Sequence, residues 1–236
     1  NNFLCCIYLT KKECGLAFAD ISTGEVNVIQ LDNNKDSSII NELSRFTPRE
    51  LVFNTELLSR NEVANFLREK LFCTADVLPD AVFEYAEAIA TVLQQFKKKD
   101  LTKLVLDHYP VATCALGGLI SYLKETQKTG LERLITINIL EEDRFMNLDM
   151  SARTNLELVE TIRTGEKRGS LLWVLDQTKT PMGKRLIRNY INQPLVNPAE
   201  ITKRLNAVDE LFKDEFLCGE IAEALSGIFD VERLIT

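Results

Sequence analysis

The sequence has little of the chemistry on which most enzymes depend, and it holds a single histidine, His108. One histidine cannot build a histidine-rich metal site, and no serine lies in the sharp strand-to-helix turn typical of a hydrolase nucleophile. Its six cysteines form no C-x-x-C pair, which excludes the usual spacing of zinc and redox sites. The cysteines therefore predict buried, reduced thiols in a cytoplasmic protein.

Long apolar runs are also missing, because no uninterrupted stretch approaches the ~18 residues that a membrane helix needs. We therefore expect no membrane partner. The chain opens at Asn1 without a methionine and without a basic segment typical of a signal peptide. Its last residues, 230–236, have the pattern of a helix interior, so we expect the sequence to be part of a longer protein.

Positive charge is in deficit, with 28 Lys and Arg against 35 Asp and Glu and a net charge of -7. Phosphate binding needs clustered positive charge, so the chain as a whole is a poor autonomous DNA binder. Residues 151–213 are an exception, with 11 basic against 7 acidic residues. Within them Lys184, Arg185 and Arg188 occupy the first two turns of an expected helix. They are candidate DNA-backbone contacts, and a plain solvated face is the alternative.

The first half of the chain has the pattern of a mixed α/β domain. Three apolar strands separated by short polar turns predict an antiparallel meander over 3–9, 14–20 and 25–31. Short strands at 50–53 and 71–75 alternate with helices at 36–46, 55–70 and 80–96, which predicts parallel pairing with right-handed crossovers.

The second half is mostly helical. A long helix at 110–127 contains Gly117 and Gly118, whose helix cost of roughly 1 kcal/mol each predicts close packing of another backbone. A strand at 135–140 follows, and then helices at 151–163, 170–175, 181–191, 198–213 and 216–225. We expect an α/β domain at 1–107 and a helical, partial domain at 108–236.

The segment Asp20-Ile-Ser-Thr-Gly24 after the second strand resembles turns of ribonuclease-H-like and actin-like folds. A metal-dependent ribonuclease-H-like or resolvase-like nuclease would need several carboxylates around Mg²⁺, and Asp76 is the one available partner for Asp20. Two acids make a thin metal site, so a plain β-turn is the alternative, and we expect no metal site.

The segment Gly165-Glu-Lys-Arg-Gly169-Ser170 has a superficial likeness to a phosphate-binding loop. It has three residues between its glycines instead of four, and no lysine follows the second glycine. We expect a loop in which Ser170 caps the following helix.

A series of segments in the second half resembles the start of the core (lever) domain of the MutS mismatch-repair family. The segments, in chain order, are Phe145-Met-Asn-Leu-Asp149, Arg153-Thr-Asn-Leu-Glu-Leu158, Gly169-Ser-Leu-Leu172, Leu175-Asp-Gln-Thr-Lys-Thr-Pro-Met-Gly-Lys-Arg-Leu186, Gln193-Pro-Leu195 and Ile201-Thr-Lys-Arg-Leu205. Residues 1–107, including Ala19-Asp-Ile-Ser-Thr-Gly-Glu25, are similar to the MutS connector domain. The resemblance covers the whole chain.

The resemblance implies a ribonuclease-H-like connector followed by a truncated helical core, without catalytic activity of its own. The Phe-x-Glu mismatch-reading motif and the Walker A loop of the family are both absent from the sequence. ATP and Mg²⁺ would be cofactors of the parent protein, which would form a homodimer and hold mismatched duplex DNA, and this chain would hold no cofactor.

In the family, the connector transmits between mismatch binding and the ATPase and contributes to docking of MutL. The candidate docking surface in this sequence is the polar stripe of the expected helix 80–96, which comprises Glu84, Glu87, Thr91 and Gln94. A merely solvated helix face is the alternative interpretation.

Overall fold

The computed structural model describes residues 2–127, 130–140, 144–146 and 148–235. The chain divides into two compact units, one over residues 1–142 (unit 1) and one over residues 143–235 (unit 2). This division differs from the one expected at residue 107. The physical reason is that residues 110–139 complete the sheet domain, both as a helix in its core and as an edge strand.

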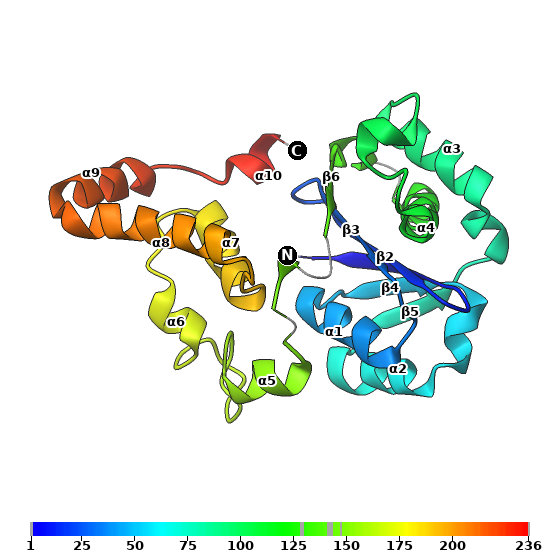
Figure 1. The fold of residues 1–236 in the computed structure, drawn as a ribbon, viewed down its shortest axis with the longest axis horizontal. Helices are drawn as coiled ribbons and strands as arrows, with labels where there is room; N and C mark the ends of the chain where they lie inside the picture. The colour runs from blue at the N-terminus through cyan, green and yellow to red at the C-terminus, as the bar shows by residue number, and fades with distance from the viewer. Residues whose placement is uncertain (1, 128–129, 141–143, 147, 236) are drawn as a thin grey trace. The chain divides into compact units, whose positions relative to one another are not determined.

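Unit 1 contains one sheet of six strands among the described residues, in the order β5-β4-β1-β2-β3-β6 (Figure 1). The strands are β1 (Leu4–Leu9), β2 (Cys14–Asp20), β3 (Glu25–Leu31), β4 (Glu50–Phe53), β5 (Thr74–Val77) and β6 (Thr136–Ile139). The expected meander β1-β2-β3 is antiparallel, whereas β4 joins β1, β5 joins β4 and β6 joins β3 in parallel. The mixed sheet with helices confirms the expected fold class.

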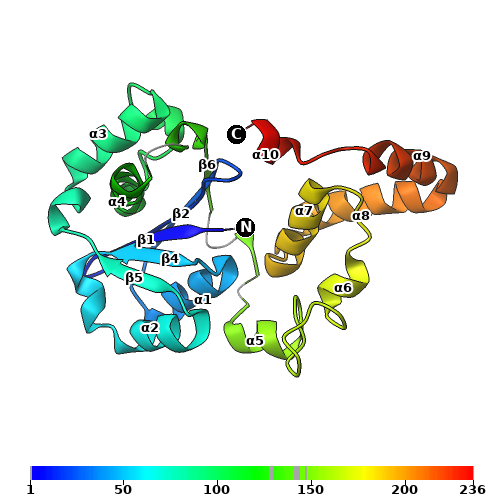
Figure 2. The same cartoon turned by 180° about the vertical axis from the view of Figure 1, so that it is seen from behind.

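Helices cover both faces of this sheet (Figures 1 and 2). One face carries α3 (Tyr85–Phe96) and α4 (Pro110–Thr126), and the other carries α1 (Asp36–Phe46) and α2 (Asn61–Phe66). On the α1 face, the ring of Phe46 stacks on Phe18 at 4.1 Å between centroids and meets Phe3 edge-on. Since the α3 and α4 face is also apolar, the inner strands β1 to β4 are buried on both sides of the sheet.

The helix α4 lies unusually close to its neighbours. A Cβ on Gly117 would meet the Cα of Ala88 in α3 at 2.6 Å, and one on Gly15 would meet the carbonyl oxygen of Val111 at 2.2 Å. The expectation of close backbone packing at Gly117 is therefore confirmed. At its start, α4 donates the Val111 and Ala112 amides to the Gln30 side chain on β3, at 3.0 and 3.3 Å.

The cysteines of unit 1 are packing groups. Cys5, Cys6 and Cys14 are buried in the sheet and form no disulfide. Burial raises the pKa of the Cys14 thiol to about 12 and raises that of Cys5 further above its ordinary value. These thiols are therefore neutral at physiological pH and behave as small apolar side chains.

Two expected helices of unit 1 are broken. The helix expected at 55–70 consists of a 3₁₀ turn (Thr55–Ser59), α2, and a π-helical turn (Leu67–Leu71), and the strand that follows begins at Thr74 rather than residue 71. The helix expected to start at Asp80 begins five residues later, because a 3₁₀ turn buries Phe83 against the Tyr8 ring and leaves Glu84 extended.

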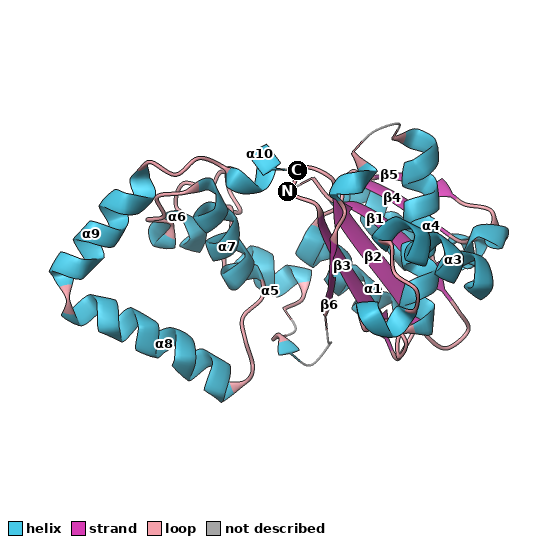
Figure 3. Cartoon of the chain, turned by 90° about the horizontal axis from the view of Figure 1, so that it is seen from above, coloured by secondary structure: helices cyan, strands magenta, loops and turns pink. Residues whose placement is uncertain are grey.

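Unit 2 is helical (Figure 3), with α5 (Met150–Asn155), α6 (Leu171–Leu175), α7 (Pro181–Asn192), α8 (Pro198–Lys213), α9 (Glu215–Ser226) and α10 (Val231–Ile235). The helix expected at 151–163 stops at Asn155, because Glu157 adopts a left-handed conformation with φ of 47°. The hydrophobic core of unit 2 is small and centres on Leu158, Leu172 and Ile191. Large apolar side chains of α8 and α9, including Phe212 and Phe216, are exposed.

In neither unit do the described residues include a helix that is both long enough and apolar enough to cross a membrane.

The close contact at Gly117 gives a test of the packing. The substitution Gly117→Val should lower the free energy of unfolding by about 2–3 kcal/mol, because the added carbons overlap backbone atoms of α3. Gly219→Val in α9 is the matched control, since a Cβ there has no neighbour within 4 Å. Urea unfolding followed by circular dichroism measures the stability of both variants. Equal stability would contradict the close packing of α4 against α3 at Gly117.

Candidate functional site

The acidic face of α3 is the first candidate surface. Glu84 and Glu87 are exposed, at the position where the extended residue 84 leads into the helix. Burial first, and the charge of Glu84 next, raise the pKa of the Cys114 thiol to about 11. Glu84 is therefore near Cys114 of α4, and it is exposed to solvent.

The expected polar stripe is wrong at Thr91, which is only 8% exposed. Helix α3 buries Ala88, Thr91, Val92 and Phe96, so its buried face extends into the expected polar stripe. This orientation follows from the contact between Ala88 and Gly117, which turns the small residues of α3 toward α4. Gln94 is exposed and already accepts a hydrogen bond from Lys124 Nζ at 2.9 Å.

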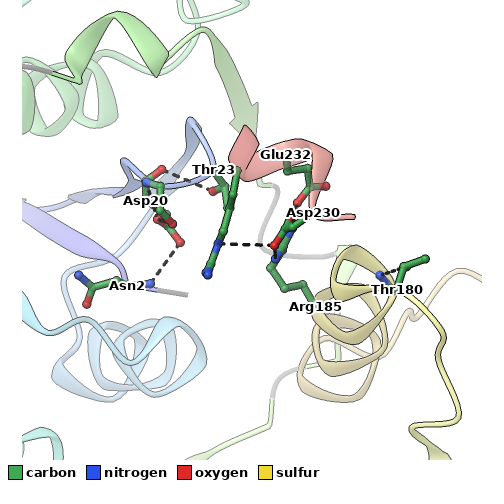
Figure 4. A network of polar contacts seen from close by, with 10 residues as sticks. Asn2, Asp20, Thr23, Thr180, Arg185, Asp230 and Glu232 are labelled. Atoms are coloured by element: carbon green, nitrogen blue, oxygen red, sulfur yellow. Dashed lines mark hydrogen bonds and ion pairs between the residues drawn. The ribbon is translucent and has the colours of Figure 1, made fainter. Parts of the chain in front are cut away.

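The basic start of α7 is the second candidate surface, and the structure separates its three residues. Lys184 and Arg188 are exposed. Arg185 is 17% exposed and donates to both carboxylate oxygens of Asp230 at 2.7 Å, as well as to Glu232 (Figure 4). The ion pair of its guanidinium connects α7 to the segment before α10. Of the three basic residues, only Lys184 and Arg188 therefore remain available to bind a phosphate.

The candidate nuclease acids, Asp20 and Asp76, are not brought together. Asp20 and Phe18, both on β2, lie on the face of the sheet that α1 covers. Asp76 on β5 lies on the opposite face, which α4 covers, together with Val52 on β4 and Cys6 on β1. Strands β1 and β4 lie between them, which separates the two strands by about 14 Å. Among the described residues, no three metal-ligating side chains gather where they could hold an ion.

Asp20 instead closes the turn that follows β2. It is buried and accepts hydrogen bonds from the Ser22 amide at 2.9 Å, the Ser22 hydroxyl at 2.6 Å and the Asn2 amide at 3.1 Å (Figure 4). Gly24 completes the turn with φ of 71°. The β-turn interpretation of this segment therefore fits the geometry, and the nuclease interpretation does not.

The loop Gly165–Ser170 is a cap and not a phosphate cradle. Ser170 Oγ accepts the amide of Trp173 at 3.2 Å, and its hydroxyl donates to the Lys167 carbonyl at 2.7 Å. Gly165 and Gly169 both have positive φ, which explains the two glycines. The expectation that Ser170 caps α6 is confirmed.

One polar cluster was not anticipated from the sequence. Tyr122 on α4 donates its hydroxyl to Glu50 on β4, and Asp76 on β5 lies near the same group. The hydrogen bond to Glu50, with burial and the nearby charges, raises the pKa of Tyr122 to about 12. The three residues are 26 to 72 positions apart in the sequence. Their proximity could be predicted only from the order of the strands in the sheet.

The ion pair of Arg185 makes a pH prediction. The hydrogen bond from Arg185 holds the pKa of Asp230 below its ordinary value, so the pair is intact at neutral pH and is lost as pH falls through that lowered pKa. Arg185→Gln should raise the midpoint toward about 3.9, the value of a free aspartate, although Arg233 still lowers it in the variant. Carboxyl-carbon NMR of Asp230 measures the midpoint, and an identical midpoint in the variant would contradict the pairing.

Comparison with known proteins finds similarity to one protein family in both units. A family model described as MutS domain II matches residues 2–135, and one described as MutS domain III matches residues 151–236. A DNA mismatch repair protein MutS of Lachnoclostridium phytofermentans is 38% identical over 235 residues, covering 100% of this chain and 25% of the relative.

Two further relatives with the same name, from Ruminiclostridium cellulolyticum and Acetivibrio thermocellus, are each 37% identical, over 237 and 238 residues. Each alignment covers 100% of this chain and 27% of the relative. The chain thus spans about a quarter of the length of the curated relatives it matches. Two consecutive domain models agree with relatives that are similar over the whole of this chain, so the chain belongs to the MutS family and corresponds to its connector (domain II) and core (domain III) regions.

Proposed function

We propose that this chain is the coupling part of a mismatch-repair protein, linking mismatched-DNA binding to an ATPase elsewhere in the parent. The observation that carries the proposal is the pairing of a connector and a core domain in one chain. The sequence has no Walker A loop, so the chemistry of ATP and Mg²⁺ belongs to other parts of the parent protein. The parent would act as a homodimer on mismatched duplex DNA.

Rigid units suit such a role, because coupling needs elements that rotate as bodies between two arrangements. Unit 1 fits this requirement, since α4 is buried along most of its length between the sheet and α3. A displacement of α3 is therefore passed directly to the sheet through the contacts at Gly117 and Gly15.

The proposed docking surface for MutL is the acidic start of α3, with Glu84 and Glu87 at its centre and Gln94 at its far end. Two carboxylates on one exposed helix face give a surface that complements a basic partner. Thr91 takes no part, because it is buried against the body of unit 1.

Charge reversal tests this surface. The double variant Glu84→Lys, Glu87→Lys should weaken MutL binding at least about tenfold, because like charges then face each other across the contact. Glu62→Lys is the matched control, since Glu62 is an exposed carboxylate on α2, on the opposite face of the sheet. Calorimetric titration of the parent protein with MutL measures both, and unchanged affinity in the double variant would remove this surface from consideration.

A second role, contact with the DNA backbone, is supported by the exposed pair Lys184 and Arg188 on α7. Replacing both with glutamine should reduce the slope of log affinity against log salt by about 2, one for each lost phosphate contact. Lys203→Gln on α8 provides an exposed control. Binding of the parent to mismatched duplex is measured across salt concentrations, and an unchanged slope would exclude the contact.

A further inference from the structure

The outer edge of the sheet at β5 is open. Strand β5 is the last in the sheet order (Figure 2). All four of its residues are exposed. The amides of Thr74 and Leu78 donate inward to carbonyls of Arg49 and Phe53, at 3.2 and 2.8 Å. By alternation along the strand, the amides and carbonyls of Ala75 and Val77 point outward and are free to pair with another strand.

An apolar pocket of about 290 Å³ borders this edge on the α2 face of the sheet. Its lining includes Phe53, Leu57 and Leu67, and it reaches β5 through Cys73 and Ala75. The volume exceeds that of a cavity known to hold a benzene ring, at roughly 150 Å³, so one aromatic or large aliphatic side chain fits.

The rim of the pocket shows backbone strain and exposed apolar surface. Phe72 follows the π-helical turn and has a left-handed backbone with φ of 49°, which a bulky residue rarely adopts. Its side chain is 82% exposed, and that of Leu58 across the rim is 62% exposed. These side chains would lose water contact when the pocket is filled, which favours an apolar occupant.

The opposite face of the same edge is acidic. Asp76 is exposed on β5, and Glu50 lies on the same face of the neighbouring β4. No described cation lies within ion-pairing distance of Asp76. A strand added to β5 would therefore place its side chains alternately toward the apolar pocket and toward these carboxylates.

From this arrangement we propose that β5 is a docking site for an extended segment of a partner protein in which bulky apolar and cationic residues alternate. The segment adds a strand to the sheet by backbone pairing with Ala75 and Val77, its apolar residue fills the pocket, and its lysine or arginine faces Asp76. A second copy of this chain fits poorly, because antiparallel pairing of two β5 strands brings two acidic faces together.

This site is separate from the acidic face of α3, and it stands whether or not α3 binds MutL. It lies on strand β5 and the turn Leu67–Leu71, whereas the proposed MutL surface lies at the start of α3. A failure at one surface therefore leaves the other unaffected.

The probe is a short blocked peptide in which phenylalanine and lysine alternate, titrated into the isotopically labelled 236-residue chain up to about 1 mM. A peptide alternating phenylalanine and glutamate is the charge control, and an N-methylated copy that cannot pair its backbone is the strand control. We expect amide shifts confined to residues of β5 and the pocket, with at least roughly tenfold weaker binding of both control peptides.

Two protein variants complete the test. Asp76→Lys should reverse the preference in favour of the glutamate peptide, whereas Asp32→Lys, on an exposed residue beyond β3, should not. Ala75→Pro should abolish binding, because it removes an outward amide while leaving the bonds to β4 in place. Should that variant fail to fold, the N-methylated peptide still tests backbone pairing.

Absence of any shift at the highest peptide concentration would overturn the proposal. So would equal binding of the lysine and glutamate peptides, or shifts that the N-methylated peptide reproduces. Concentration-dependent changes at β5 without peptide would assign the edge to a second copy of the chain and would also overturn it.

Discussion

The close approach of α4 to the sheet and to α3 is the constraint on which unit 1 depends. At Gly15 and Gly117 there is no room for a side chain, because backbone atoms of the neighbouring element occupy the space. Two elements this close bury α4 along residues 111–120 and at Leu123, and they leave one orientation for α3. That orientation turns Ala88 and Thr91 inward and leaves Glu84 and Glu87 in solvent. The candidate docking surface is thus a consequence of glycine positions on other elements.

Unit 2 is held together differently. Its core is small, and specific polar contacts do much of the positioning. Arg153 donates to the carbonyls of Leu148 and Asn192 at 3.0 and 2.9 Å, which ties α5 to the end of α7. The guanidinium of Arg204 lies 3.5 Å from the centroid of the Tyr190 ring and links α8 to α7. Exposed apolar side chains on α8 and α9 fit the proposal that the core region works within a larger protein.

Periodicity and turn chemistry predict the meander, the parallel pairing of β4 and β5, the glycine-dependent packing of α4 and the cap at Ser170, but not the pairing of β6 with β3. They failed where tertiary contacts override local preference. Phe72 and Glu157 adopt left-handed conformations without being glycine, and burial of Phe83 delays the start of α3. Helical periodicity predicts a polar stripe on α3 but not which edge of that stripe faces α4, so it does not predict the burial of Thr91.

Site prediction failed for a related reason, which is that partners distant in sequence decide what a charged side chain can do. Arg185 has the position of a phosphate ligand, yet its carboxylate partners lie about 45 residues later. The separation of Asp20 from Asp76 depends on strand order and on which face each strand presents. The open edge at β5 and its pocket depend on the strand order and on contacts between residues distant in sequence. Sequence patterns alone therefore do not predict them.

Amide hydrogen exchange of the 236-residue chain, with and without MutL, tests the central claim that unit 1 is the docking part of this coupling module. A docking surface on unit 1 predicts protection on MutL binding that is concentrated at the start of α3, around residues 84–90, with a smaller effect in α4 beneath it. Protection confined to α7–α10, or none at saturating MutL, would exclude docking through unit 1.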